Sequence, residues 1–296
     1  METFGVIAQF ERQPDRYTVW SNFQGPYILQ PIMARALRVS GNFLRLISAP
    51  FSGGSFGLKQ SIYPYIVLLA AASRISGLPL KWTEDRLEHL MASSSAADRA
   101  DELEAAFTSD GTLLGLRFKN CVNVGAYVRA PEPASVYRMH AASNGCYAVK
   151  NISIQNKLVS TNKMPVGLNR GYGGPQFYYG LERMMDLTAR KLNIDTAEIR
   201  RKNFIPEDQF PYHAPAGAIY DSGNYSEALD LLLKLSNYEN IKRRRKQARA
   251  AGKLFGIGMG AGVEPSGSNM AYVTLAQTAE ERLSLIHISE PTRHLL

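Results

Sequence analysis

A glycine-rich loop at residues 169–176 (NRGYGGPQ) runs directly into a long helical pattern, and it limits the possible folds more than any other stretch. Glycine adopts positive φ and lets a backbone approach a ligand without a Cβ in the way. Pro175 suits a first helical position, and the free N–H groups of a first helical turn attract an anion. The stretch therefore predicts an anion site that includes the cation of Arg170. The alternative is a tight turn beside a surface arginine.

Another glycine-rich loop occupies residues 52–60 (SGGSFGLKQ), between an apolar β-rich run and a helical pattern. A strand, a glycine loop and a helix in this order form a layout that binds phosphate. The loop is not the nucleotide-binding P-loop, because Lys59 is followed by Gln60 and not by Ser or Thr. Its glycine spacing also differs from the dinucleotide-binding fingerprint. Alone, the loop does not distinguish an anion site from an ordinary turn.

The remaining pattern mixes strands, hairpins and helices without an internal repeat, which predicts an α+β (mixed α/β) fold. Residues 122–127 read as a loop that contains glycine. Residues 256–263 (GIGMGAGV) read as a strand that packs closely against a neighbour or lines a ligand site. Strands are predicted at 6–10, 17–21, 43–49, 80–82, 114–118 and 152–158, and helices at 31–37, 64–76, 175–192, 195–202, 225–235 and 238–251.

The composition is that of an ordinary globular protein, with 45% hydrophobic and 20% charged residues in 296. No apolar run reaches the roughly 18 residues of a membrane span, and no secretory leader is evident. Cys121 and Cys146 are too few for a disulfide framework or a zinc cluster. The expected compartment is therefore the reducing cytoplasm, and the length permits one large domain or two.

The net charge of +8 includes one dense basic cluster (KRRRK) from Lys242 to Lys246, within a helical pattern. A solvated helix face is the interpretation that we favour. The alternative is a non-catalytic basic protein that binds nucleic acid through this cluster. No interleaved aromatic residues and no groove-reading motif support that alternative, so no nucleic-acid partner is expected.

The sequence pattern of the final residues, 283–296, differs from that of the rest of the chain. Residues 283–293 (LSLIHISEPTR) resemble one reading frame of a transposase adaptor used to prepare DNA for sequencing. We therefore interpret residues 283–296 as an artefactual tail and expect the native sequence to be interrupted near Arg282.

Four separated segments, in order along the chain, resemble the large subunit of the molybdenum hydroxylases, the family of xanthine dehydrogenase, aldehyde oxidase and aerobic carbon monoxide dehydrogenase. They are GGSFGLK at 53–59, LKWTEDRLEH at 80–89, RGYGGPQ at 170–176 and EIRRKN at 198–203. The resemblance covers nearly all of residues 2–270. It implies a first molybdopterin-binding domain at 1–210, and a helical pair with the start of the second domain at 211–282.

The resemblance also implies a cofactor and a reaction. Molybdenum is held by a molybdopterin, possibly in its cytosine dinucleotide form, and this large phosphate-bearing anion suits the two glycine loops. The implied enzyme is an oxidoreductase that hydroxylates an aldehyde or an N-heteroaromatic compound with oxygen from water. Electrons pass to 2Fe–2S clusters and FAD on partners, an iron–sulfur small subunit and a FAD-binding medium subunit. The catalytic glutamate is expected beyond Arg282, so the chain alone is expected to be inactive; a further hypothesis is that the chain alone binds nothing and folds poorly.

The resemblance assigns roles to individual residues. Arg138 aligns with an arginine that stabilises charge on the substrate, and Tyr172 and Gln60 align with substrate-binding positions. No protein ligand to the metal is assigned. Gln60 stands where purine enzymes have glutamate, and Gly171 stands where carbon monoxide dehydrogenases have a copper-binding cysteine, so neither xanthine nor carbon monoxide is the expected substrate. The residues expected to hold the cofactor are Gln24, Gly54, Ser55, Phe56, Gly57, Arg170 and Gly171.

Overall fold

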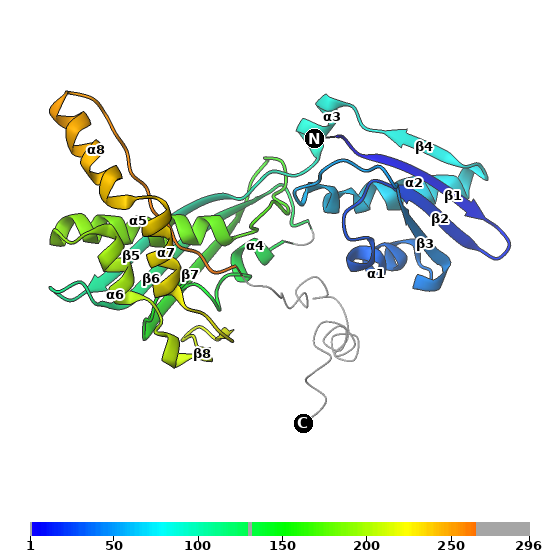
Figure 1. The fold of residues 1–296 in the computed structure, drawn as a ribbon. Helices are drawn as coiled ribbons and strands as arrows, with labels where there is room; N and C mark the ends of the chain where they lie inside the picture. The colour runs from blue at the N-terminus through cyan, green and yellow to red at the C-terminus, as the bar shows by residue number, and fades with distance from the viewer. Residues whose placement is uncertain (1, 130–131, 265–296) are drawn as a thin grey trace.

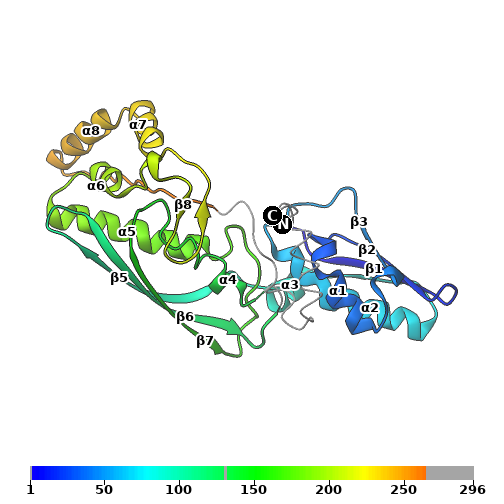
Figure 2. The ribbon, with the colours of Figure 1, turned by 90° about the horizontal axis from the view of Figure 1, so that it is seen from below.

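The computed structural model describes residues 2–129 and 132–264, which form two lobes, each with its own hydrophobic core (Figures 1 and 2). The first lobe contains the N-terminal strands and helices, and the second contains a longer sheet with helices packed on it. The mixture of sheets and helices confirms the predicted fold class. The tail at 283–296 lies outside the described residues.

The first lobe is built on a four-stranded sheet in the order β3-β2-β1-β4. Strand β1 runs antiparallel to β2 and β4, whereas β2 runs parallel to β3. In β1 the buried residues Val6 and Ala8 alternate with more exposed ones, and α2 packs against this strand. The elements are β1 (Gly5–Glu11), β2 (Arg16–Ser21), α1 (Pro26–Leu37), η1 (Gly41–Phe43), β3 (Leu44–Ser48), η2 (Leu58–Ile62), α2 (Tyr63–Ser76), β4 (Leu80–Thr83) and α3 (Arg86–Ala92).

The second lobe is built on a three-stranded sheet in the order β5-β6-β7, with β5 antiparallel and β7 parallel to β6. Helix α5 packs against β5 and α6, and it buries Phe177, Leu181, Met185 and Ala189, which share one helical face. The elements are β5 (Asp98–Phe107), β6 (Leu113–Gly125), α4 (Ala134–Tyr137), β7 (Asn151–Ser160), α5 (Gly174–Leu192), α6 (Thr196–Asn203), η3 (Glu207–Gln209), β8 (Tyr212–His213), β9 (Ile219–Tyr220), α7 (Tyr225–Leu235) and α8 (Tyr238–Ala250).

Two local predictions were wrong. Strand β6 continues through Gly125, so much of the loop predicted at 122–127 is strand. Residues 256–263 form no strand, because side chains of α5 and α6 bond their backbone in place of a neighbouring strand: Glu182 accepts from the Ala261 amide, and Arg200 donates to the Met259 carbonyl.

Helix α1 begins at Pro26, five residues before its predicted start, with Pro31 inside it. Strand β5 and helix α3 were not predicted. The sequence of β5 (DRADELEAAF) is rich in charged residues and alanine and has low intrinsic strand propensity, and its long antiparallel pairing with β6 stabilises it. No helix among residues 2–129 and 132–264 is long and apolar enough to cross a membrane.

Candidate functional site

The two glycine loops face one cavity of about 540 Å³, at the junction of the two lobes. One wall comes from the first lobe and includes the loop at 52–60, called the first glycine loop below. The other comes from the second lobe and includes the loop at 169–176, called the second glycine loop. The lining residues are Gln24, Gly25, Ile28, Ser55, Phe56, Gly57, Gln60, Arg138, Leu168, Asn169, Arg170, Gly171, Tyr172 and Glu264.

The first glycine loop holds an unusual backbone conformation at the cavity. Phe56 has a φ of 54° and Gly57 a φ of 108°. The Ser55 hydroxyl accepts hydrogen bonds from the amides of Gly57 (3.2 Å) and Lys59 (3.0 Å), which fixes the turn. A Cβ on Gly57 would lie 2.7 Å from the Leu168 carbonyl oxygen, so only glycine lets the two walls come this close.

The second glycine loop makes two consecutive tight turns. The Tyr172 amide donates to the Asn169 carbonyl, and the Gly174 amide donates to the Gly171 carbonyl, both at 2.8 Å. A Cβ on Gly173 would lie 2.3 Å from the Ser135 carbonyl oxygen, so this position also requires glycine. Tyr172 itself has a φ of 24°. Non-glycine residues with positive φ concentrate at functional sites, and here Phe56 and Tyr172 both line the cavity.

Two arginines bring positive charge to the cavity. The Arg170 guanidinium carbon lies 4.9 Å from the centroid of the Phe56 ring, which orients the cation across the junction of the lobes. Arg138 donates to the carbonyls of Gly171 (3.1 Å) and Tyr172 (3.3 Å) and forms an ion pair with Glu264. Its side chain is 13% exposed. Both cations are therefore held in place by the loops themselves.

Gln60 brings a buried amide to the cavity. Its side chain is 3% exposed, and its Oε1 has no hydrogen-bond partner among the residues that the structure describes. A buried polar atom without a partner costs about 1–3 kcal/mol. Such an atom at the wall of a cavity fits a ligand that supplies the missing donor.

Lys59 lies behind the first glycine loop and does not line the cavity. Its ammonium group donates to the Gly53 carbonyl (2.6 Å) and forms an ion pair with Glu2. These contacts with Lys59, together with a bond from Asn22, lower the pKa of Glu2 to about 2. Lys59 therefore fixes the loop from behind, which is a different use from the phosphate-binding lysine of a P-loop.

A buried carboxyl group, Glu132, supports the second glycine loop. Its Oε2 accepts bonds from the Ser135 hydroxyl (2.6 Å) and the Ser135 amide (3.3 Å), and Tyr172 lies within hydrogen-bonding contact. Burial raises the pKa of Glu132 above its ordinary value, although the bonds from Ser135 and Tyr172 oppose this rise. No sequence pattern marks Glu132, because it is a lone glutamate in a loop.

The structure brings together all but one of the residues that the resemblance assigns to the site. The exception is Gly54, which does not line the cavity; a Cβ there would lie 3.8 Å from the Phe56 ring. Glu264 lines the cavity but was not predicted. The predicted residues that line it are Gln24, Ser55, Phe56, Gly57, Gln60, Arg138, Arg170, Gly171 and Tyr172.

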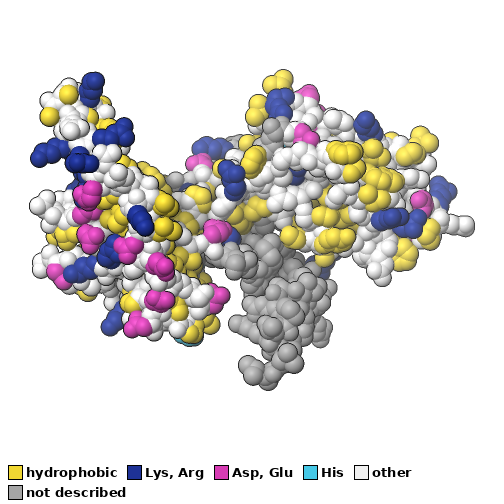
Figure 3. Space-filling view, in the orientation of Figure 1, with side chains coloured by type: hydrophobic (Ala, Val, Ile, Leu, Met, Phe, Trp, Pro, Cys, Tyr) yellow, Lys and Arg dark blue, Asp and Glu magenta, His cyan; other side chains and the backbone are white. Residues whose placement is uncertain are grey.

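The basic cluster lies away from the cavity, on α8. Figure 3 shows lysine and arginine side chains gathered on the projecting α8. Lys242 is paired with Glu239 (2.6 Å) and Asp195 (3.4 Å), and the Arg244 guanidinium lies 5.4 Å from the Phe255 ring centroid. Part of the cluster is therefore used in contacts within the lobe.

The residues around the cavity fit a phosphate-bearing anionic cofactor. They combine the Arg170 guanidinium and glycine backbone without side chains with a second guanidinium, Arg138, that is paired with Glu264. Guanidinium groups and bare backbone are the usual partners of phosphate oxygens. This donor set suits a polyanion and leaves room for a second, smaller molecule.

Comparison with known proteins agrees with this donor set. Residues 1–204 match the model of the molybdopterin cofactor-binding domain. The chain is 34% identical over 272 residues to the nicotine 6-hydroxylase large subunit of Paenarthrobacter nicotinovorans, covering 91% of the chain and 33% of that protein. It is 35% identical over 266 residues to the carbon monoxide dehydrogenase large chain of Hydrogenophaga pseudoflava, covering 88% and 33%.

Among solved structures, quinoline 2-oxidoreductase from Pseudomonas putida 86 superposes with a TM-score of 0.79 at 31% identity, over 85% of this chain and 32% of that one. The chain thus spans about a third of the length of the curated relatives it matches. The matched domain, the relatives and the shared fold together show that this chain belongs to the molybdopterin-binding large-subunit family of the molybdenum hydroxylases.

Proposed function

We propose that the chain is part of the catalytic subunit of a molybdenum-dependent oxidoreductase that hydroxylates an aldehyde or an N-heteroaromatic compound with oxygen from water. The observation that carries the proposal is the convergence of Phe56, Arg170, Arg138 and Gln60 on one cavity from two lobes. A cavity with fixed cations and aromatic walls suits both a polyanionic cofactor and a flat, weakly polar substrate.

The cofactor would be held by the two glycine loops. Arg170 and the backbone of Gly57 and Gly171 face the cavity without intervening side chains and suit phosphate or other anionic oxygens. The Gln24 amide and the Ser55 loop complete this wall. When bound, the molybdopterin complex supplies the two-electron redox chemistry.

The substrate would lie beside Arg138. Its guanidinium is fixed by the Gly171 and Tyr172 carbonyls, so it can stabilise negative charge that develops on a substrate without reorganising. Tyr172 and Phe56 offer ring surfaces for a planar compound, and Gln60 offers a buried amide. Gln60 and Gly171, which replace the glutamate of purine enzymes and the cysteine of carbon monoxide dehydrogenases, argue against xanthine and carbon monoxide as substrates.

The partners that we propose are an iron–sulfur small subunit and a FAD-binding medium subunit, which would receive the electrons in the cytoplasm. Several relatives are named as large or gamma subunits, which supports assembly with other chains. We also propose the division into domains at 1–210 and 211–282. The whole enzyme is required for turnover, because the catalytic glutamate of the family is not assigned to any residue of this chain.

The experiment is turnover by the full-length subunit assembled with its partner subunits. Benzaldehyde and quinoline are supplied separately as substrates, with a dye as electron acceptor, in water enriched in the heavy oxygen isotope. We expect one of them to yield a product labelled with that oxygen. The Arg138→Gln variant should lower kcat about a hundredfold, as loss of one fixed donor to a developing anion does. Arg243→Gln, on the exposed face of α8, is the matched control and should not change kcat. Absence of labelled product from a molybdenum-loaded complex would contradict the proposal.

A further inference from the structure

The cavity contains one acid that the proposed function does not use. Glu264 lines it and forms an ion pair with Arg138, and the two side chains are 55% and 13% exposed. The Glu264 carboxylate and the carbonyls of Gly171 and Tyr172 therefore lie against the guanidinium. The Glu264 carboxylate, placed in this way, competes with any anion that would approach Arg138.

We propose that Glu264 is a positioning residue, which holds the Arg138 guanidinium against the second glycine loop and keeps this cation from capturing anionic ligands. The catalytic consequence of this placement rests on the proposed function. The placement itself does not, because it follows from contacts among the described residues.

The carboxylate of Glu264 lies at the beginning of α5. A Cβ built on Gly174, the first residue of this 19-residue helix, would be 3.4 Å from Glu264 Oε2. The positive end of a helix dipole, at its N-terminus, stabilises a nearby carboxylate. Glu264 is thus stabilised by the start of α5 and by Arg138, and it remains a charged partner for the guanidinium.

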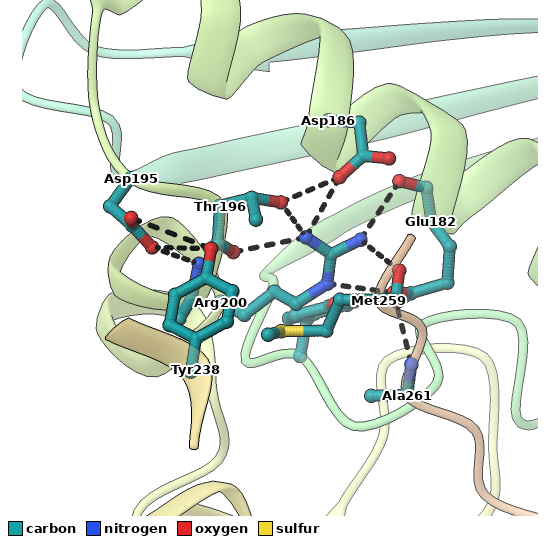
Figure 4. A network of polar contacts seen from close by, with 10 residues as sticks. Glu182, Asp186, Asp195, Thr196, Arg200, Tyr238, Met259 and Ala261 are labelled. Carbon is teal, nitrogen blue, oxygen red and sulfur yellow. Dashed lines mark hydrogen bonds and ion pairs between the residues drawn. The ribbon is translucent and has the colours of Figure 1, made fainter. Parts of the chain in front are cut away.

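The segment that carries Glu264 is fixed by a buried ion-pair network (Figure 4). Arg200, fully buried, pairs through Nε with Glu182 (2.8 Å) and through Nη1 with Asp186 (3.0 Å). Arg200 and Glu182 also bond the backbone just before Glu264. Arg200 Nη2 donates to the Met259 carbonyl, and Glu182 accepts from the Ala261 amide, both at 3.0 Å.

One further contact extends this connection to the cavity. The Tyr178 hydroxyl, from the first turns of α5, donates to the Val263 carbonyl, next to Glu264. Helix α5 therefore contributes both Glu182 and Tyr178 to the same short segment. The glycine-alternating stretch, predicted as a strand, instead connects the buried network to Arg138.

The test is binding of benzoate, a small carboxylate, to the full-length subunit isolated without cofactor, measured by calorimetry. The variant Glu264→Gln keeps the shape of the side chain and removes its charge. We expect benzoate affinity to rise about threefold to tenfold, because a negative charge beside Arg138 is removed. The double variant Arg138→Gln/Glu264→Gln should lose this gain. The control Glu104→Gln, in an exposed ion pair with Arg117 and 50% exposed, should bind benzoate as the wild type does.

A second readout uses the assembled, molybdenum-loaded complex. Glu264→Gln should lower kcat for a neutral substrate about tenfold with little change in KM, and Glu264→Asp should restore part of kcat. Equal benzoate affinity in Glu264→Gln and the wild type overturns the inference, whether or not the complex turns over. If benzoate binding changes as expected while no substrate is oxidised, the placement of Glu264 stands and the proposed function fails.

Discussion

The guanidinium carbon of Arg170 lies 4.9 Å from the centroid of the Phe56 ring. The two residues come from different lobes and from different glycine loops, and they meet at the wall of one cavity. Gly57 also lies close to the Leu168 carbonyl. Both lobes therefore form the walls of the cavity. Changes at this junction are therefore expected to affect folding and ligand binding together.

The first prediction concerns Gly57. Gly57→Ala should destabilise the protein by roughly 2–4 kcal/mol, because the new Cβ would meet the Leu168 carbonyl oxygen at 2.7 Å and the backbone has a φ of 108°. The matched control is Gly77→Ala, where φ is 71° and nothing lies within 4 Å of the added Cβ. The control should cost only about 1 kcal/mol, the strain of the left-handed conformation. Urea unfolding of both variants checks the difference, and equal costs would contradict the close packing of the lobes.

The second prediction concerns the buried network around Arg200. Arg200→Met should cost about 3–5 kcal/mol, because it removes a fully buried cation and leaves the half-buried Glu182 and Asp186 without their compensating charge. The neighbouring Arg201→Met is the control. Arg201 pairs with Asp230 and Glu198 at a more exposed position, so its loss should cost less than about 1 kcal/mol. Denaturant midpoints measure both, and similar midpoints for the two variants would count against a structural role for the network.

The third prediction concerns pH and Glu132. Burial raises the pKa of this carboxyl in the folded protein, so folding favours its neutral form. The resulting stability is fully present below the unfolded pKa and is lost as pH rises through the folded pKa. Glu132→Gln, which mimics the neutral acid, should reduce the loss of stability on raising the pH.

The measurement for Glu132 is the unfolding midpoint of wild type and variant across the acidic to neutral range. Glu104→Gln, an exposed glutamate, serves as the control and should leave the pH profile unchanged. Parallel profiles for wild type and Glu132→Gln would show that the carboxyl does not titrate in this way.

The fourth prediction concerns the basic cluster on α8. If its five cations contacted phosphates, the affinity for duplex DNA would fall with a logarithmic salt slope of about −4 to −5. We expect no such binding, because Lys242 already pairs with Glu239 and Asp195. Fluorescence anisotropy with a short duplex at low salt measures this, and steep salt-dependent binding would favour the alternative of a nucleic-acid-binding protein.

Local sequence patterns were sufficient to predict the elements in which glycine positions or hydrophobic periodicity restrict the backbone. The two glycine loops and the helices that follow them were predicted, because Pro175, Gly173 and the turn at Gly57 leave few conformations. The strand β5 was missed, since its charged sequence forms a strand only through pairing with β6. Likewise the segment at 256–263 was read as a strand, although its backbone partners are side chains from α5 and α6.

Prediction of the site residues was likewise limited to residues in local sequence motifs. Residues within recognisable motifs, such as Phe56 and Arg170, were identified together with their loops. Glu264 and Glu132 lie in no motif, and their position depends on contacts between segments distant in sequence. Such residues become visible only when the fold brings them against Arg138 and Tyr172.

Molybdenum content per full-length subunit, assembled with its partner subunits, tests the central claim that the two glycine loops hold one anionic cofactor. The comparison is between wild type, Arg170→Gln and the surface control Arg243→Gln after exhaustive dialysis. We predict that Arg170→Gln retains about a tenth of the wild-type molybdenum or less, since a charge-assisted contact to an anion contributes roughly 1.5–3 kcal/mol. The control should retain the wild-type amount. Wild-type molybdenum in the Arg170→Gln variant would contradict the account.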